Sequence, residues 1–220
     1  SLIPRSVGYL GVSPKLIDSS VGHITPHIDK DGAVRKMPPV ICNDGLPYPS
    51  LALMTFEQIA GLSLKRVVPG DFWGPYASLY FSEDYEYKIP LDNFGLASLA
   101  FDLNPTNVMT FSAVDVIKGR IPSNQLNGRV VFVGATAFSL GDVVPTPLTG
   151  ATHGVFLHVQ ALRNLLDENI PQHLGKENLI ILFEMVALGI AMAIMVNAFK
   201  LTPWVILAIS VATPSLIWLF

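Results

Sequence analysis

Two long apolar runs near the end of the sequence place the strongest constraint on its fold. Leu179 to Phe199 covers 21 residues with one charged side chain, Glu184, and Leu201 to Phe220 covers 20 residues with none. Because an α-helix rises about 1.5 Å per residue, about 20 apolar residues cross the roughly 30 Å hydrocarbon layer of a bilayer. Lys200 alone separates the runs. The sequence therefore predicts a hairpin of two transmembrane helices, residues 177–199 and 201–220.

The distribution of charge separates these runs from the rest of the chain. Of the 14 Lys and Arg and the 17 Asp and Glu, all but Lys200 and Glu184 lie within residues 1–177. A pair of helices buried in a large soluble core fits this contrast poorly, since apolar runs of about 18 or more residues are typical of membrane spans. We therefore expect residues 1–176 to form one soluble domain on one side of a membrane.

The single lysine between the runs indicates the orientation. Short cytoplasmic loops favour Lys and Arg, so a cytoplasmic turn at Lys200 places the soluble domain outside the cytoplasm. The first residues lack the charged and apolar regions of a signal peptide, and no polar residue follows the second run. We expect the sequence to be part of a longer protein, with the soluble domain truncated at its N-terminal end.

Composition and motifs exclude several classes of function. The net charge is −3 and no cluster of Lys and Arg occurs, so nucleic acid is not an expected partner. Cys42 is the only cysteine, which excludes a disulfide framework within the chain. The G-x-S-x-G, P-loop, G-x-G-x-x-G and H-E-x-x-H motifs are all absent. We therefore predict no catalytic residue, no metal site and no cofactor.

Local patterns predict the elements of the soluble part. Strand-like segments flank the turn Asp29–Gly32, and Ser50 can cap a helix that ends near Gly61. A second hairpin is expected over residues 85–101, with its turn at 92–95. Ser112 begins a short helix that continues through Lys118. In the helix after Ser50, the spacing assigns the apolar face to Leu51, Met54, Ile59 and Leu62.

The clearest unit lies downstream and predicts an α/β domain. Residues 129–133 form a continuous apolar run, typical of a strand buried on both faces. A helix follows over about 154–169. On a helical wheel its predicted apolar face contains Val155, Val159, Leu162, Leu165 and Leu166, and its predicted solvated face contains Gln160, Arg163, Asn164 and Asp167. A buried strand followed by an amphipathic crossover helix is characteristic of an α/β fold.

Position in this unit identifies the best candidates for ligand binding. In open α/β sheets, ligands bind outside the carboxyl ends of the strands. Thr136, Ser139, Asp142 and Thr146 follow the predicted strand and are the candidate ligand-binding residues. The alternative is structural: Asp142 and Thr146 then fasten a proline-rich loop through local hydrogen bonds.

Three other polar features leave two interpretations each. His23, Thr25, His27 and Asp29 alternate, so on a strand they share one face, which is either a metal site or an ordinary polar face. His158 falls within the apolar face of its helix and is either a ligand or a hydrogen-bonded core histidine. Glu184 lies five residues into the first run, where it either reaches the membrane interface or pairs within a helix bundle.

The ordered segments resemble the second type of CHASE domain, the cyclase/histidine-kinase-associated sensing extracellular domain. The resemblance covers residues 22–169 and depends on the segments DKDGAVRKMP, YPSLAL, IPLDNFG, SAVDVIKGRIPSNQLNGRVVFVGATAFSLGDVVPTPL and GVFLHVQALRNLL. The sequence departs from the family's pattern in lacking a leading transmembrane helix with a further strand-rich portion, and the third helix that often follows the domain.

This resemblance implies the sensory part of a receptor in a bacterial inner membrane, with the soluble domain periplasmic or extracellular. In the family, cytoplasmic adenylate or diguanylate cyclases, histidine kinases or serine/threonine kinases receive the signal. No ligand comes with the resemblance, and receptors of this kind generally act as homodimers. Two alternatives stay open, a membrane-anchored periplasmic enzyme and a structural domain of a membrane complex.

Overall fold

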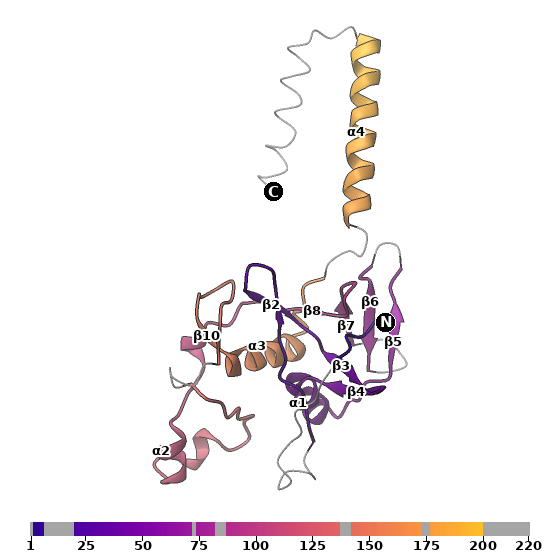
Figure 1. Ribbon diagram of the computed structural model, residues 1–220. Helices are drawn as coiled ribbons and strands as arrows, with labels where there is room; N and C mark the ends of the chain where they lie inside the picture. Colours follow the sequence, from indigo (N-terminus) through magenta and orange to yellow (C-terminus); the bar gives the residue numbers. More distant parts are fainter. Residues whose placement is uncertain are drawn as a thin grey trace. The chain divides into compact units, whose positions relative to one another are not determined.

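The computed structural model describes residues 2–6, 20–71, 74–81, 87–136, 142–172 and 177–199 (Figure 1). The chain divides into two compact units, residues 1–175 and 176–220. In the first unit the strands are β1 (His27–Ile28), β2 (Val34–Met37), β3 (Val40–Asn43), β4 (Leu46–Pro49), β5 (Arg66–Pro69), β6 (Ala77–Tyr80), β7 (Lys88–Leu91), β8 (Ala97–Ser98), β9 (Val143–Val144) and β10 (Thr152–His153). Its helices are α1 (Leu51–Ala60), α2 (Ala113–Ile117), α3 (Gly154–Leu166) and two short 3₁₀ turns, η2 (Pro105–Asn107) and η3 (Ser123–Gln125).

Small antiparallel sheets make up the β structure of this unit. The described strands pair in the orders β1-β2-β8, β3-β4, β5-β6-β7 and β9-β10. The unit is therefore a mixture of α and β, as predicted, but its ladders join neighbouring antiparallel strands instead of parallel strands linked by crossover helices. This difference removes the topological reason for expecting a ligand at a row of strand ends.

The predicted turns are confirmed, although one of them joins two sheets. β1 and β2 pair across the turn at Asp29–Gly32, where Gly32 has φ +84°. The turn at 92–95 also forms: the Gly95 N–H donates to the Asp92 carbonyl at 3.1 Å. The strands on either side of it do not form the predicted hairpin, since β7 pairs with β6 and β8 pairs with β2.

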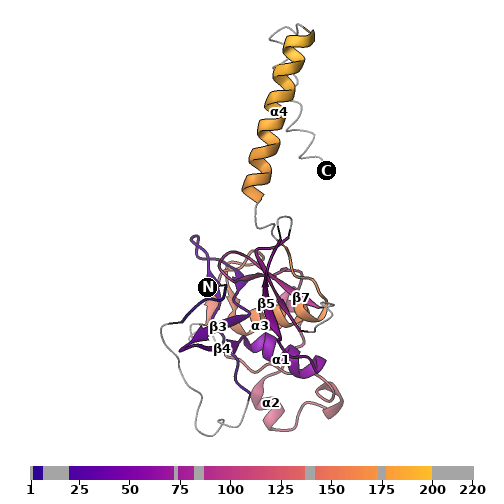
Figure 2. The ribbon, with the colours of Figure 1, turned by 90° about the vertical axis from the view of Figure 1, so that its right-hand side faces the viewer.

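Helix α1 begins and ends where the sequence predicts. The Ser50 hydroxyl accepts a hydrogen bond from the Leu53 N–H at 3.2 Å, and Gly61 ends the helix in the left-handed conformation. The predicted apolar face of α1 is wrong, because the residues that α1 buries are Ala52, Leu53 and Phe56. The adjacent α3 sets the rotation of α1, and the two helices lie side by side in both views (Figure 1, Figure 2).

Helix α3 confirms the predicted helix but buries a different set of residues. Leu162 and Leu165 are buried as expected, whereas Leu166 is 48% exposed. Gln160 and Asn164 were predicted to be solvated and are 4% and 2% exposed. The Asn164 amide accepts a hydrogen bond from the Ala100 N–H at 3.0 Å and donates one to the Ala100 carbonyl at 3.1 Å. Burial of these amides is favourable because they satisfy backbone groups of the segment that follows β8.

One core joins these elements. Apolar side chains from β2, β3, β6, β7, β8, α1 and α3 form a single buried cluster. Phe56 of α1 stacks on Tyr87 with ring centroids 4.9 Å apart, and Phe81 packs edge-on against both rings. The Tyr87 hydroxyl donates a hydrogen bond to the Leu165 carbonyl in the last turn of α3. This aromatic cluster therefore links α1, the chain around β6 and β7, and the end of α3.

The predicted strand at 129–133 is not formed. No described strand pairs with these residues, and Val131 and Val133 are 57% and 88% exposed. A run of β-branched residues has strand propensity, but a strand is stable only where a neighbouring strand satisfies its backbone. Phe132 alone packs partly against the core. The short helix predicted after Ser112 is present as α2.

The second unit contains α4 (Glu177–Phe199), which coincides with the first predicted span. Within the described ranges, no helix is long and apolar enough to cross a membrane. Lys200 and the second predicted span, residues 201–220, lie outside the residues that the structure describes. The two transmembrane helices therefore stay a prediction from the sequence.

The role of Asn164 can be tested by replacing it with alanine. The variant leaves both backbone groups of Ala100 without their partner, so the free energy of unfolding should fall by about 2–4 kcal/mol. The matched control is Asn169→Ala, which removes an exposed bond of 3.2 Å to Asp102 and should cost less than about 1 kcal/mol. Urea unfolding of the two variants measures the difference, and equal losses would contradict the assigned role of Asn164.

Candidate functional site

The structure brings only part of the predicted ligand-binding set together. Thr136 and Asp142 are exposed, Thr146 is 9% exposed, and Ser139 lies outside the described residues. Because the strand before Thr136 is not formed, these residues do not lie at a row of strand ends. Their common location is the neighbourhood of the first turn of α3. A methyl group at Gly134 would lie 2.5 Å from the Val155 side chain, so this segment passes directly over α3.

Thr146 has a structural role in its own loop. Its N–H donates to the Thr149 carbonyl at 2.8 Å, and its hydroxyl lies 3.2 Å from the Thr152 hydroxyl. The Thr149 N–H also donates to the Thr146 hydroxyl at 3.3 Å. These bonds satisfy the polar groups of Thr146 inside the loop, so the geometry favours the loop-fastening interpretation over ligand binding for this residue.

Asp142 lies against the beginning of α3. The Gly154 N–H donates to the Asp142 carbonyl at 2.9 Å, and a methyl group placed on Gly154 would lie 2.4 Å from a carboxylate oxygen of Asp142. Glycine at the first position of α3 therefore permits this close approach. The negative charge of Asp142 also acts on His158, one turn further along the helix. Asp142 thus belongs to a site that contains a buried histidine.

His158 is the buried centre of this site. It is 7% exposed, as expected of a core histidine, but its Nδ1 atom has no hydrogen-bond partner among the described residues. Burial lowers the pKa of His158, and the carboxylate of Asp142 opposes this shift. An unpaired ring nitrogen in an apolar environment disfavours the charged imidazolium.

A second histidine, His23, lies near enough to His158 for their charges to interact. Its Nε2 atom is buried and unpaired within the described structure, while its Nδ1 accepts a bond from the Thr25 N–H at 3.3 Å. Burial, followed by repulsion from a charged His158, lowers the pKa of His23 from 6.5 to about 4, although the Pro38 carbonyl opposes this. Both imidazoles are therefore neutral at pH 7.

A short extended segment holds His23 in place, and we call residues 20–26 the His23 segment. The His23 N–H donates to the Pro49 carbonyl at 2.9 Å, and the Leu51 N–H donates to the His23 carbonyl at 2.8 Å. A methyl group on Gly22 would lie 2.6 Å from the Leu51 Cα atom. Only glycine lets the segment approach the first turn of α1 this closely.

The alternative metal site at this segment is not assembled. Only residues 27 and 28 are in a strand, so His23, Thr25, His27 and Asp29 do not share a strand face. The closest approach of His27 to Asp29 is 3.7 Å, and Asp29 pairs with Arg35 at 2.8 Å. No group of three His, Cys, Asp or Glu side chains in the described part of the chain could hold a metal ion.

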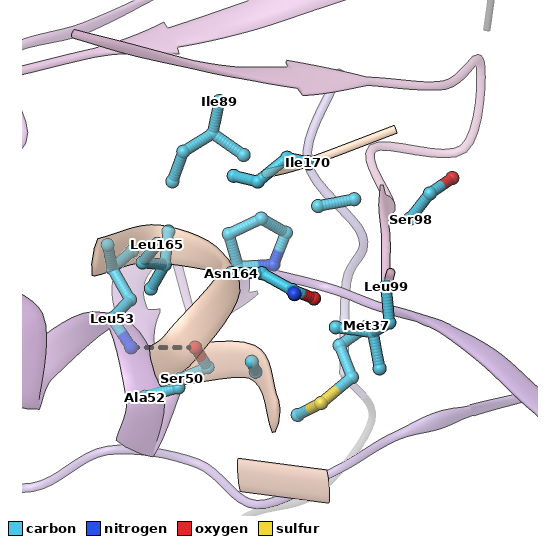
Figure 3. Close-up of a pocket in the computed structure, with 13 residues that line it drawn as sticks. Met37, Ser50, Ala52, Leu53, Ile89, Ser98, Leu99, Asn164, Leu165 and Ile170 are labelled. Carbon is cyan, nitrogen blue, oxygen red and sulfur yellow. Dashed lines mark hydrogen bonds between the residues drawn. The ribbon is translucent and has the colours of Figure 1, made fainter. Parts of the chain in front are cut away.

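A small cavity lies between α1, α3 and the strands β2, β7 and β8 (Figure 3). Its volume is about 30 Å³, which holds one or two water molecules but is far below the roughly 300 Å³ of a typical organic ligand site. Met37, Leu53, Ile89 and Leu99 supply much of its apolar wall, and the amide of Asn164 is already bonded to Ala100. The cavity is therefore a packing defect of the core and offers no site for an organic ligand.

Comparison with known proteins decides the family. The family model described as CHASE2 domain matches residues 4–197. The chain belongs to the CHASE2 domain family. CHASE2 domains are extracellular, non-catalytic sensor domains of signalling receptors, so the resemblance read from the sequence and the sensory role are confirmed at this level. No curated protein and no solved structure matches the chain.

The two histidines of this CHASE2 domain belong to separate features of the sequence. His158 was interpreted as a core histidine and His23 as part of an alternating polar face. They are 135 positions apart, and neither residue forms a local motif that could indicate their interaction. The sequence feature that indicates this site is His158, a polar residue within the apolar pattern of α3, because a buried histidine requires an explanation.

The neutral histidines predict a pH dependence of stability. A histidine with a lowered pKa in the folded state destabilises that state as the pH falls from about 6.5 toward the folded value. Between pH 7 and pH 5 we expect the free energy of unfolding of the full chain in detergent to fall by roughly 1–2 kcal/mol. Hydrogen bonds from Arg35 lower the pKa of Asp31 to about 2, so that carboxylate titrates outside this window.

The control is a change of the same kind at an exposed histidine. The slope of stability against pH should become smaller in the His23→Leu and His158→Leu variants, whereas His27→Leu should retain the wild-type slope. Urea unfolding at half-unit intervals from pH 7 to pH 5 measures the slopes. A wild-type slope in all three variants would contradict the assignment.

Proposed function

We propose that residues 1–176 form the extracytoplasmic sensory domain of a bacterial transmembrane receptor, which passes its state to a cytoplasmic cyclase or kinase domain. The single observation that supports this most strongly is the CHASE2 match over residues 4–197.

The membrane part of the proposal depends on the sequence of residues 179–220. In support of it, α4 displays apolar side chains around its circumference, with Phe183 and Met185 76% and 67% exposed. A helix with apolar side chains around its circumference is favoured in an apolar environment. Glu184 lies close to the beginning of this helix, where it can reach the membrane interface.

The route of the signal follows the order of the chain. α3 ends at Leu166, and residues 167–176 lead into α4. A change in the packing of α3 is thus transmitted to the first membrane span through a short linker. Transmission requires two states of the domain that the signal binds unequally.

A topology experiment tests the proposed placement. A reporter enzyme that is active only in the periplasm should be active when fused after Asn169 and inactive when fused after Lys200. The same two fusions to a reporter that is active only in the cytoplasm serve as the control and should give the opposite pattern. Cytoplasmic activity after Asn169 would contradict the sensory placement.

We further propose that the receptor acts as a homodimer through the first span. Gly189 and Ala193 are small residues four positions apart, which lets helix backbones approach closely. In the full-length receptor, cysteines introduced at Gly189 and Ala193 should crosslink between subunits several-fold faster than cysteines at Ile190 and Ile194. Equal crosslinking at the four positions would contradict a dimer contact on this face.

A further inference from the structure

The buried nitrogens of His23 and His158 indicate a function that the sensory assignment alone does not explain. Nε2 of His23 and Nδ1 of His158 are both inaccessible to solvent and without a partner among the described residues. Native proteins satisfy most buried polar atoms, so two unsatisfied nitrogens in one interacting pair require an explanation. In neutral His23 the Nε2 atom carries the proton, because Nδ1 accepts the bond from the Thr25 N–H; a second proton binds at Nδ1 and displaces that bond.

The elements next to His23 and His158 do not supply a second carboxylate that could offset the positive charge of two protonated imidazoles. On α1 the only charged residue is Glu57, which accepts a bond from the Leu64 N–H near the other end of the helix. On α3 the only other charged residue is Arg163, which pairs with Asp167 at 3.1 Å. The segment 37–41, which includes the Pro38 carbonyl beside His23, has no ionisable side chain. Asp142 is therefore the carboxylate that acts on the pair, and it acts on His158.

The His23 segment can separate from the start of α1 while the core stays folded. Its contacts with the start of α1 are two backbone hydrogen bonds at His23 and the close approach of Gly22. Ile24 is 65% exposed, and Thr25 is exposed as well. No residue of this segment belongs to the buried core cluster. Local opening therefore exposes His23 and takes it away from His158 without exposing the core.

We propose that this domain senses protons, and that protonation of His23 and His158 releases the His23 segment from the start of α1. The inference deepens the proposed sensory function and rests on it, since only a domain outside the cytoplasm meets the pH of the surroundings. Histidine is the side chain whose charge changes between pH 5 and 8, and buried histidines act as switches in this range.

The size of the response follows from linkage. A histidine that titrates at about 4 when the segment is closed and at 6.5 when it is open shifts the ratio of open to closed forms about 20-fold between pH 7 and pH 5. Protonation of His158 adds to this shift because its pKa is also lowered by burial. The direction is toward the open form as the pH falls.

Distance measurement between two spin labels tests the switch in the full chain reconstituted in lipid nanodiscs. Cys42 is the only cysteine and is replaced by serine, and labels are attached at Thr25→Cys and Leu166→Cys, both exposed positions. At pH 7 we expect one short distance. At pH 5 a second, longer distance should appear, with its population ratio raised about 20-fold.

Three variants make the test specific. The double variant His23→Leu/His158→Leu should keep the pH 7 distance at pH 5. Gly22→Ala should show the longer distance already at pH 7, since its methyl group collides with the backbone of Leu51. Asp142→Asn keeps both histidines and needs no core substitution. Loss of its charge lowers the pKa of His158 further in the closed form, so protonation favours opening more strongly and the transition should move to higher pH.

A wild-type distance that does not change between pH 7 and pH 5 would overturn the proposal, as would an equal change in the double histidine variant. An unaltered midpoint in Asp142→Asn would overturn the part assigned to His158. These outcomes are separate from the topology experiment, because a failed reporter fusion contradicts the sensory placement and leaves the measured distances unaffected.

Discussion

The packing of polar and apolar groups on α3 determines the architecture of the soluble unit. Its leucines contribute to the core, while Asn164 and Gln160 bind the chain segment that runs from Ala100 to Leu103. No described strand pairs with that segment, and the two side-chain amides bond its backbone as a neighbouring strand would. At one end of α3 Asp142 lies against Gly154, and at the other Tyr87 binds the Leu165 carbonyl.

Features that depend on a few adjacent residues could be predicted from the sequence. The Ser50 cap, the turns at 29–32 and 92–95 and the beginning of α3 follow from local chemistry, and each is present; α3 ends at Leu166, three residues before the predicted limit. The face that each helix buries is less local, because it depends on which element packs beside it. The apolar spacing in α1 therefore predicts that a helix forms but not which face it buries. In α3 the burial of Asn164 cannot be predicted from local spacing, because its partner Ala100 is 64 positions away.

The candidate site shows the same difference between local features, which could be predicted, and contacts between distant residues, which could not. Asp142 and Thr146 were selected for their position after a predicted strand, and that reason fails since residues 129–133 have no pairing partner among the described strands. Asp142 nevertheless lies beside His158, a relation that depends on the path of the loop and not on any motif. Family membership could be recognised because it depends on the order of many short segments. An error in the secondary structure predicted for one segment does not change that order.

The two hydrogen bonds between Asn164 and Ala100 also make the stability of the domain depend on the side-chain nitrogen of Asn164. Hydrolysis of the Asn164 amide to a carboxylate replaces a donor with an oxygen that faces the Ala100 carbonyl, and it places a negative charge at a 2% exposed position. The same reaction at Asn169 alters only an exposed contact with Asp102. Spontaneous deamidation, a slow chemical ageing of proteins, would therefore destabilise the fold much more at Asn164 than at Asn169.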